Sequence, residues 1–156
     1  MKTYTLFCIC FLIQFAACKT LKQLESEGKL ILSMERTACY GTCPIYEIKL
    51  YDNGLLLYNG KKYVSKTGTY IAKCNKHEVN DLTHSILNSR FFDLENKYPV
   101  NIFAPSDLPG CTIYFSIKDK QKRIEEHSLQ TPRVLTFVEA NIDSFVASKN
   151  LQTSDK

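Results

Sequence analysis

The sequence lacks the short motifs that mark several common enzyme classes. It has only six glycines, and none of them belongs to the Gly-rich loop that cradles a phosphate or to the Gly-x-Ser-x-Gly turn of a serine hydrolase. Its acidic residues show no pairing of the kind that a glycosidase needs. The usual starting points for a catalytic assignment are therefore missing, although catalytic groups can also converge from distant segments.

The chain also lacks a strong excess of charge. Its 20 basic and 16 acidic residues give a formal net charge of +4, and the basic residues are scattered along the sequence. A protein that binds DNA or RNA normally gathers its basic residues in a patch or stripe, so we expect no nucleic-acid partner. With 156 residues, of which 44% are hydrophobic, the chain suits one globular domain.

The apolar run near the N-terminus is too short to span a bilayer, which takes about 20 residues. It covers residues 6–17 and matches the apolar core of a secretory signal peptide. Ala16 and Ala17 then precede Cys18, and this junction resembles a bacterial lipobox, in which the cysteine thiol receives a diacylglycerol and the signal is cut just before it. The resemblance implies a signal peptide over residues 1–17 and a lipid bilayer contacted through acylated Cys18.

The residues after this junction bear on the place of such a protein in the cell. Sorting in Gram-negative bacteria usually retains lipoproteins with Asp after the lipidated cysteine in the inner membrane, so Lys19 favours an outer-membrane anchor that faces the periplasm or the cell exterior. We expect a polar tether over residues 18–29, a domain over residues 30–149 and a disordered tail over residues 150–156. The alternative is a plain signal peptide that leaves Cys18 as a free thiol.

Alternating side chains and turn signals predict an α+β domain. Residues 45–51 alternate as a half-buried strand does, and Asn53-Gly54 then favours a tight hairpin because both residues tolerate positive φ. Asn75 and Glu78 form a capping-box pattern, and Thr131-Pro132 marks a second helix start. The order ββββαββα implies a single antiparallel sheet of about six strands with two helices packed on one face. The predicted strands cover 29–36, 45–51, 55–60, 66–73, 111–117 and 122–129, and the predicted helices cover 75–88 and 132–149.

Four cysteines remain when the signal peptide and the lipidated cysteine are set aside. Oxidising compartments favour disulfides, and four cysteines allow three connectivities. Cys39 and Cys43 flank a tight turn that contains Gly41, so their Cα atoms could approach to about 5–6 Å, as a disulfide requires. Cys74 ends one predicted strand and Cys111 begins another, and we expect the disulfides Cys39–Cys43 and Cys74–Cys111.

Two kinds of chemistry compete with a structural role for these cysteines. A four-thiolate zinc site would need two closely spaced pairs, and Cys74 and Cys111 are not such a pair. A thiol–disulfide oxidoreductase would carry Cys-x-x-Cys at a helix start, whereas Cys39 and Cys43 have three residues between them and a strand after them. We predict no metal and no cofactor, and we keep redox chemistry at Cys39 and Cys43 as the alternative.

The segment around the close pair reads Arg-Thr-x-Cys-Tyr-Gly-x-Cys-Pro-x-Tyr over residues 36–46. It resembles the mark of a family of uncharacterised bacterial secreted proteins and lipoproteins, and the similarity extends over residues 30–147. That family has no assigned function, so the resemblance supports export and the limits of the domain without adding chemistry. Its first two cysteines occur together, often without counterparts of the other two, which implies that Cys39 and Cys43 pair with each other.

The turn between the close cysteines is also the predicted recognition surface, and we expect the loop over residues 101–110 to fold near it. The guanidinium of Arg36 can bind a carboxylate in a bidentate way, but an internal pair between Arg36 and Asp107 is the favoured interpretation. We expect a non-enzymatic, membrane-anchored binding module for an unknown protein or envelope ligand. The alternatives are an envelope enzyme or thiol-redox factor and a secreted inhibitor-like binder. The candidate surface comprises Arg36, Thr37, Tyr40, Gly41, Pro44, Tyr46 and Asp107.

Overall fold

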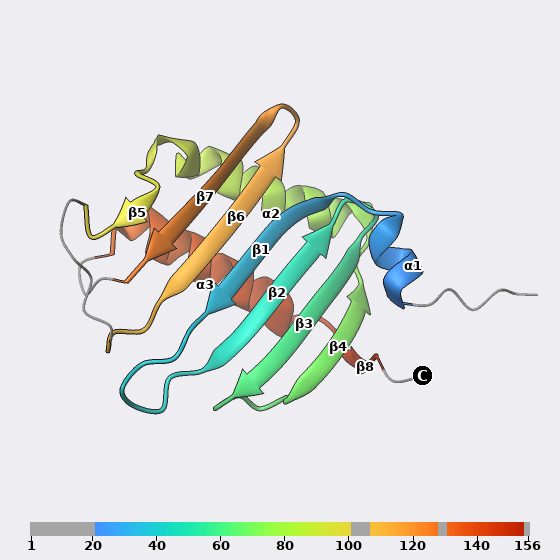
Figure 1. Cartoon of the computed structure of the whole chain (residues 1–156). Helices are drawn as coiled ribbons and strands as arrows, with labels where there is room; N and C mark the ends of the chain where they lie inside the picture. Colours follow the sequence, from blue (N-terminus) through green and yellow to red (C-terminus); the bar gives the residue numbers. More distant parts are fainter. Residues whose placement is uncertain (1–20, 101–106, 128–130, 155–156) are drawn as a thin grey trace, which may run out of the picture.

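The computed structural model describes residues 21–100, 107–127 and 131–154 (Figure 1). The strands are β1 (Leu30–Arg36), β2 (Ile45–Tyr51), β3 (Leu55–Lys62), β4 (Gly68–Lys73), β5 (Lys97–Tyr98), β6 (Cys111–Ile117), β7 (Lys120–Glu126) and β8 (Gln152–Thr153). The helices are α1 (Leu21–Ser26), α2 (Lys76–Asn88) and α3 (Arg133–Ala147), with a 3-10 turn η1 (Phe91–Asp93). All eight strands form one sheet in the order β5-β7-β6-β1-β2-β3-β4-β8.

The α+β class is confirmed, and the six long strands lie close to their predicted positions. The sheet nevertheless has eight strands and is mixed, because β5 runs parallel to β7 while β8 pairs antiparallel with β4. Both extra strands contain two residues, which is too short for an alternating pattern to be visible in the sequence. The prediction of a disordered tail over residues 150–156 is therefore wrong at residues 152–153.

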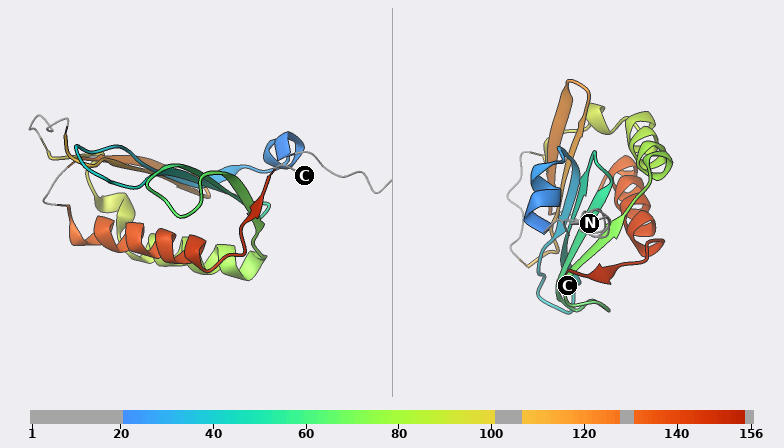
Figure 2. Two further views of the ribbon diagram at one scale, coloured as in Figure 1. Left: turned by 90° about the horizontal axis from the view of Figure 1, so that it is seen from below. Right: turned by 90° about the vertical axis from the view of Figure 1, so that its right-hand side faces the viewer.

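Two helices cover one face of the sheet, which we call the inner face. In Figure 2, α2 and α3 lie side by side beneath the sheet and α1 lies on the opposite side. The alternation of the strands places every second side chain under α2 and α3, where these side chains form the core. The core residues that are almost fully buried include Leu32, Met34, Ile48, Leu50, Leu56, Ile86, Phe91, Ile113, Phe115, Ile124, Leu135, Val138 and Ile142.

The opposite face carries a smaller apolar cluster under α1. Tyr51, Leu55 and Leu57 are buried there, and Leu21 packs against them. The Tyr51 hydroxyl donates a hydrogen bond to Glu25 (3.2 Å), and burial together with the Glu25 charge raises the pKa of Tyr51 to about 12. Part of the predicted tether is thus a helix that contacts the sheet.

The two main helices begin in different ways. At α2 the predicted capping box is confirmed: the Asn75 side chain accepts from the Glu78 amide (3.0 Å), and Glu78 accepts from the Asn75 amide (2.8 Å). At α3 the expected Thr131 cap is absent, because the Thr131 hydroxyl donates to Glu126 (2.6 Å) and Pro132 occupies the cap position. The Thr131 hydroxyl thus forms a tertiary contact with β7 in place of the local contact that would cap the helix.

The sheet has two ends that differ in what they carry. The tether end holds α1, the start of β1, the β2–β3 and β6–β7 turns and the start of α2 (Figure 1). The tip end holds the β1–β2 connection, the β3–β4 turn and the start of β6. The seven residues of β1 join the two ends, which places them roughly 20 Å apart.

Candidate functional site

The tip end carries the cysteine turn, residues 37–44, which we call the stapled tip. Cys39 and Cys43 form a disulfide with a Cα separation of 5.7 Å, in agreement with the expectation for this pair. Tyr40 lies between them with 94% of its surface exposed. Gly41 and Pro44 are exposed as well, and the stapled tip projects beyond the ends of β1 and β2 (Figure 1).

Backbone contacts fix the stapled tip to the segment before β6. The Thr37 amide donates to the Gly110 carbonyl (2.9 Å), and the Gly110 amide donates to the Thr37 hydroxyl (3.0 Å). The Tyr40 amide donates to the Asp107 carbonyl (3.1 Å). A Cβ at Gly110 would lie 2.1 Å from the His127 ring and 2.6 Å from Thr37 Oγ1, so no larger residue fits there without a shift.

Arg36 points away from this segment, to the inner face. Its Nη1 pairs with Glu139 (3.0 Å) and its Nη2 with Asp143 (2.8 Å). These two carboxylates are four residues apart on α3, so they lie on one face of the helix. The expected partner, Asp107, is exposed and engages the tip through its backbone. An internal ion pair is therefore present, but the predicted partner is wrong.

Tyr46 closes this network from the neighbouring strand. Its hydroxyl accepts from Arg36 Nε (2.7 Å) and donates to Asp143 (2.5 Å). Burial and the hydrogen bond to Asp143 raise the pKa of Tyr46. Since Nε and both terminal nitrogens of Arg36 have partners, the guanidinium binds α3 to the sheet and is not free to anchor a ligand carboxylate.

Glu139 has the least complete hydrogen bonding in the network. Its Oε1 is buried without a hydrogen-bond partner within the described residues. Burial raises the pKa of Glu139, although the charge of Arg36 and its hydrogen bond to Glu139 oppose this shift. Burial and the nearby Glu139 charge also raise the pKa of the Cys111 thiol.

Cys74 and Cys111 are free and buried, so the expected second disulfide is wrong. Cys74 follows β4 at the tether end, where its amide donates to the Gly54 carbonyl (2.8 Å). Cys111 opens β6 at the tip end, opposite Arg36. A disulfide requires Cα atoms within about 7 Å, and the length of the sheet separates these two. Burial raises the pKa of Cys74 too, so neither thiol is suited to nucleophilic chemistry.

A cavity of about 400 Å³ lies beside the network at the tip end. Tyr46 and Tyr58 form one wall with their rings stacked at 5.7 Å. Asp143 of α3 and Lys149, which follows α3, contribute charges. Sequence reasoning missed Tyr58, Glu139 and Asp143. Their only signals were the inward position of the tyrosine on a strand and the four-residue spacing of the acids on a helix.

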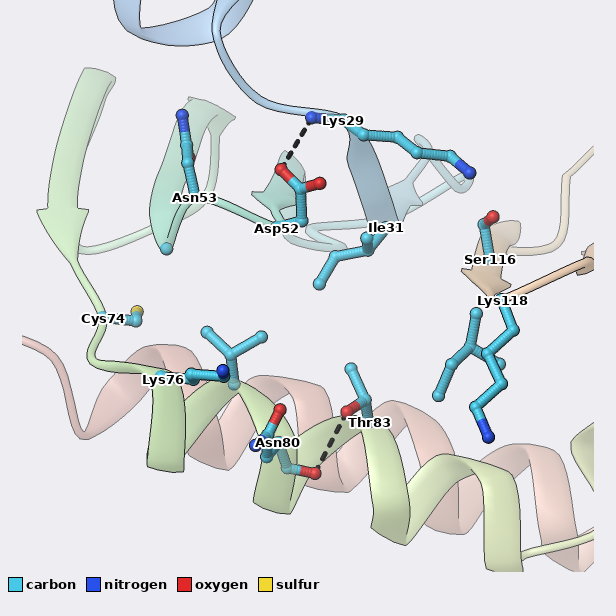
Figure 3. Close-up of a pocket in the computed structure, with 13 residues that line it drawn as sticks. Lys29, Ile31, Asp52, Asn53, Cys74, Lys76, Asn80, Thr83, Ser116 and Lys118 are labelled. Atoms are coloured by element: carbon cyan, nitrogen blue, oxygen red, sulfur yellow. Dashed lines mark hydrogen bonds between the residues drawn. The ribbon is translucent and has the colours of Figure 1, made fainter.

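A second cavity, of about 570 Å³, lies at the tether end (Figure 3). It is formed by the start of α2, the β2–β3 turn and the β6–β7 turn, and it carries Lys29, Lys76 and Lys118. No sequence motif predicts this cavity, because its residues come from separate parts of the sequence.

The part of the chain that the structure describes holds no group of three His, Cys, Asp or Glu side chains placed to bind a metal. None of the helices described is both long and apolar enough to cross a membrane.

No curated protein matches this sequence. A family described as a domain of unknown function, DUF6438, matches residues 30–146, which include the stapled tip, the Arg36 network and the sheet from β1 to β7. These residues make up most of the chain and most of the fold. The chain therefore belongs to the DUF6438 family.

Proposed function

We propose that this protein is a lipid-anchored, non-enzymatic binding module of the bacterial cell envelope that contacts its partner with the stapled tip. The observation that carries the proposal is the opposite placement of the two ends. α1 adjoins the start of β1, and the stapled tip leaves the end of β1 (Figure 1). Cys18 lies outside the described residues. A lipid on Cys18 would hold the tether end at the bilayer and leave the tip pointing away from it.

The stapled tip has the properties of a binding surface. Exposed aromatic side chains supply large contact area at low entropic cost, and Tyr40 is almost completely exposed. The disulfide and the backbone bonds to Asp107 and Gly110 order the tip before any partner arrives. The ion-pair network underneath joins β1 and β2 to α3, which gives the tip a rigid base.

The anchor is tested by growing cells with a clickable fatty acid. We expect label on the wild type and on Cys8→Ala, which changes a cysteine in the same apolar run, and no label on Cys18→Ala. Label that persists on Cys18→Ala would exclude acylation at this cysteine.

The tip is tested by replacing Tyr40 with a photo-crosslinking amino acid in cells. We expect a discrete adduct from position 40 and none from position 137, because Phe137 is an exposed aromatic residue of α3 and is not part of the stapled tip. Excess purified wild type should compete the adduct away and Tyr40→Ala should not. An adduct from position 137 alone would refute recognition by the tip.

An envelope thiol-redox factor is the second candidate, supported by one contact. The Gly41 amide donates to Cys39 Sγ (3.2 Å), and such a donor would favour a thiolate if the disulfide were reduced. Incubation of the folded protein with a graded glutathione redox buffer separates the two candidates. A structural disulfide stays oxidised across the range, whereas a redox-active pair exchanges with the buffer.

A further inference from the structure

The tether-end cavity gathers positive charge that has no carboxylate partner among the residues that the structure describes. Lys29, Lys76 and Lys118 line it from three different segments, and all three are exposed. Within the described residues their ammonium groups form no ion pair. Asp52 is the only carboxylate among the described residues that line the cavity, and it accepts from the Lys29 backbone amide (2.8 Å). The cavity is therefore suited to an anion.

Hydroxyl groups in the same cavity are available to a ligand. Ser116 is only 5% exposed, and its hydroxyl makes no hydrogen bond to the described part of the chain. Thr83 is 7% exposed and donates to the Asn80 carbonyl (3.0 Å), which leaves its oxygen able to accept (Figure 3). The oxygens of Ser116 and Thr83 can therefore each form a further hydrogen bond to a bound molecule.

Apolar side chains adjoin these polar groups. Ile31, Val79 and Ile117 line the cavity, and Figure 3 shows Ile31 above α2 and near Thr83. A volume of about 570 Å³ lies in the range of small-molecule sites. The lining thus combines cations, hydroxyls and an apolar surface, a combination that matches an anionic amphiphile better than a simple anion.

We infer that this cavity binds the phosphate headgroup and the first acyl carbons of an anionic phospholipid. The inference rests on the proposed anchor, because a lipid on Cys18 would hold this end of the sheet at a bilayer. Lysines near an anionic membrane surface are attracted to it, and the attraction fades with distance and salt. The lysines would contact the phosphate, Ser116 would donate to it, and Ile31, Val79 and Ile117 would contact the acyl carbons.

The test uses the full chain carrying Cys18→Ala and soluble short-chain probes observed by NMR. We expect dihexanoyl-phosphatidylglycerol, below its micellar concentration, to shift the amide signals of Lys76, Thr83 and Ser116 saturably. Dihexanoyl-phosphatidylcholine and glycerol 3-phosphate should bind at least about tenfold more weakly, because one lacks the net negative charge and the other the acyl chains. Equal binding of phosphatidylcholine would refute anion recognition, and equal binding of glycerol 3-phosphate would refute a lipid.

Two triple variants distinguish binding in the cavity from a general attraction of the anionic lipid to positive charge. The triple variant Lys29→Gln, Lys76→Gln, Lys118→Gln should weaken phosphatidylglycerol binding by about tenfold or more. The control Lys61→Gln, Lys62→Gln, Lys97→Gln removes equal charge elsewhere and should leave binding unchanged. Ser116→Ala should weaken binding without lowering the melting temperature. Equal loss in both triple variants would overturn the site. The chain used for NMR carries Cys18→Ala, so its lipid binding does not depend on acylation. If fatty-acid labelling of the wild type fails while this lipid binding is intact, only the proposed anchor is refuted.

Discussion

At Arg36, a guanidinium lies between one tyrosine hydroxyl and two carboxylates from α3. Tyr46→Phe removes the hydroxyl and leaves Arg36 Nε without its acceptor in a partly buried site. We expect a loss of about 1–3 kcal/mol in the free energy of unfolding, measured by urea titration. Tyr58→Phe is the matched control, because the Tyr58 ring stacks on Tyr46 and its hydroxyl makes no hydrogen bond within the described residues. Equal losses in the two variants would contradict a specific role of the Tyr46 hydroxyl.

Glu139 gives stability a defined pH dependence. Its pKa is raised in the folded protein, chiefly by burial. Such a carboxyl group stabilises the fold below its unfolded pKa of about 4.3, and this contribution is lost as the pH rises through the folded value. Glu139→Gln removes the titration, so the variant should gain stability relative to the wild type as the pH rises above the unfolded pKa of about 4.3.

This expectation is checked by urea titrations of both proteins at several pH values. Glu47→Gln, on the opposite face of the sheet, is the control for the loss of one carboxylate. A difference between wild type and Glu139→Gln that stays constant or shrinks with rising pH would contradict it.

At the scale of elements, the disulfide of the stapled tip can be removed without changing any core residue. Cys39→Ser with Cys43→Ser should lower the free energy of unfolding by about 2 kcal/mol, the chain-entropy value for so short a loop. The far-UV circular dichroism spectrum should stay unchanged, since the sheet hydrogen bonds remain. Global unfolding of this double variant would show instead that the disulfide is needed for the fold.

Some secondary-structure elements could be predicted from the sequence and others could not. The six long strands and the α2 cap follow from local signals: alternation along seven residues, or an Asn and a Glu three residues apart. The two-residue strands β5 and β8 have no period to detect. At α3 the local cap signal was present, but Thr131 bonds to Glu126 of β7, and no local pattern encodes that competition.

At the scale of the whole molecule, sequence could not show which strand ends meet. Cys74 and Cys111 each lie at a strand end, but at opposite ends of the sheet. The two carboxylate partners of Arg36 lie more than 100 residues away on α3, and three distant segments form the lysine cavity. Such arrangements depend on topology, which local patterns constrain only weakly.

The thiol count provides a test of this architecture. In the folded protein, processed and acylated at Cys18, we expect no thiol to react rapidly with Ellman's reagent at pH 8, because Cys74 and Cys111 are buried with raised pKa values. Two thiols should react in denaturant, and four after reduction of Cys39–Cys43. No reactive thiol in denaturant would reveal a second disulfide and contradict the strand order.

The short strand β8 has a consequence for how the molecule behaves among its own copies. It pairs with Tyr70 and Ile71 of β4, and the Ser154 amide donates to the Thr69 carbonyl (3.1 Å). Without these contacts, the outer edge of β4 would present unpaired amides and carbonyls to solvent, and such an edge recruits further strands. The few residues after α3 thus protect the protein against edge-to-edge aggregation, a property that would matter most where anchored copies are crowded on a membrane.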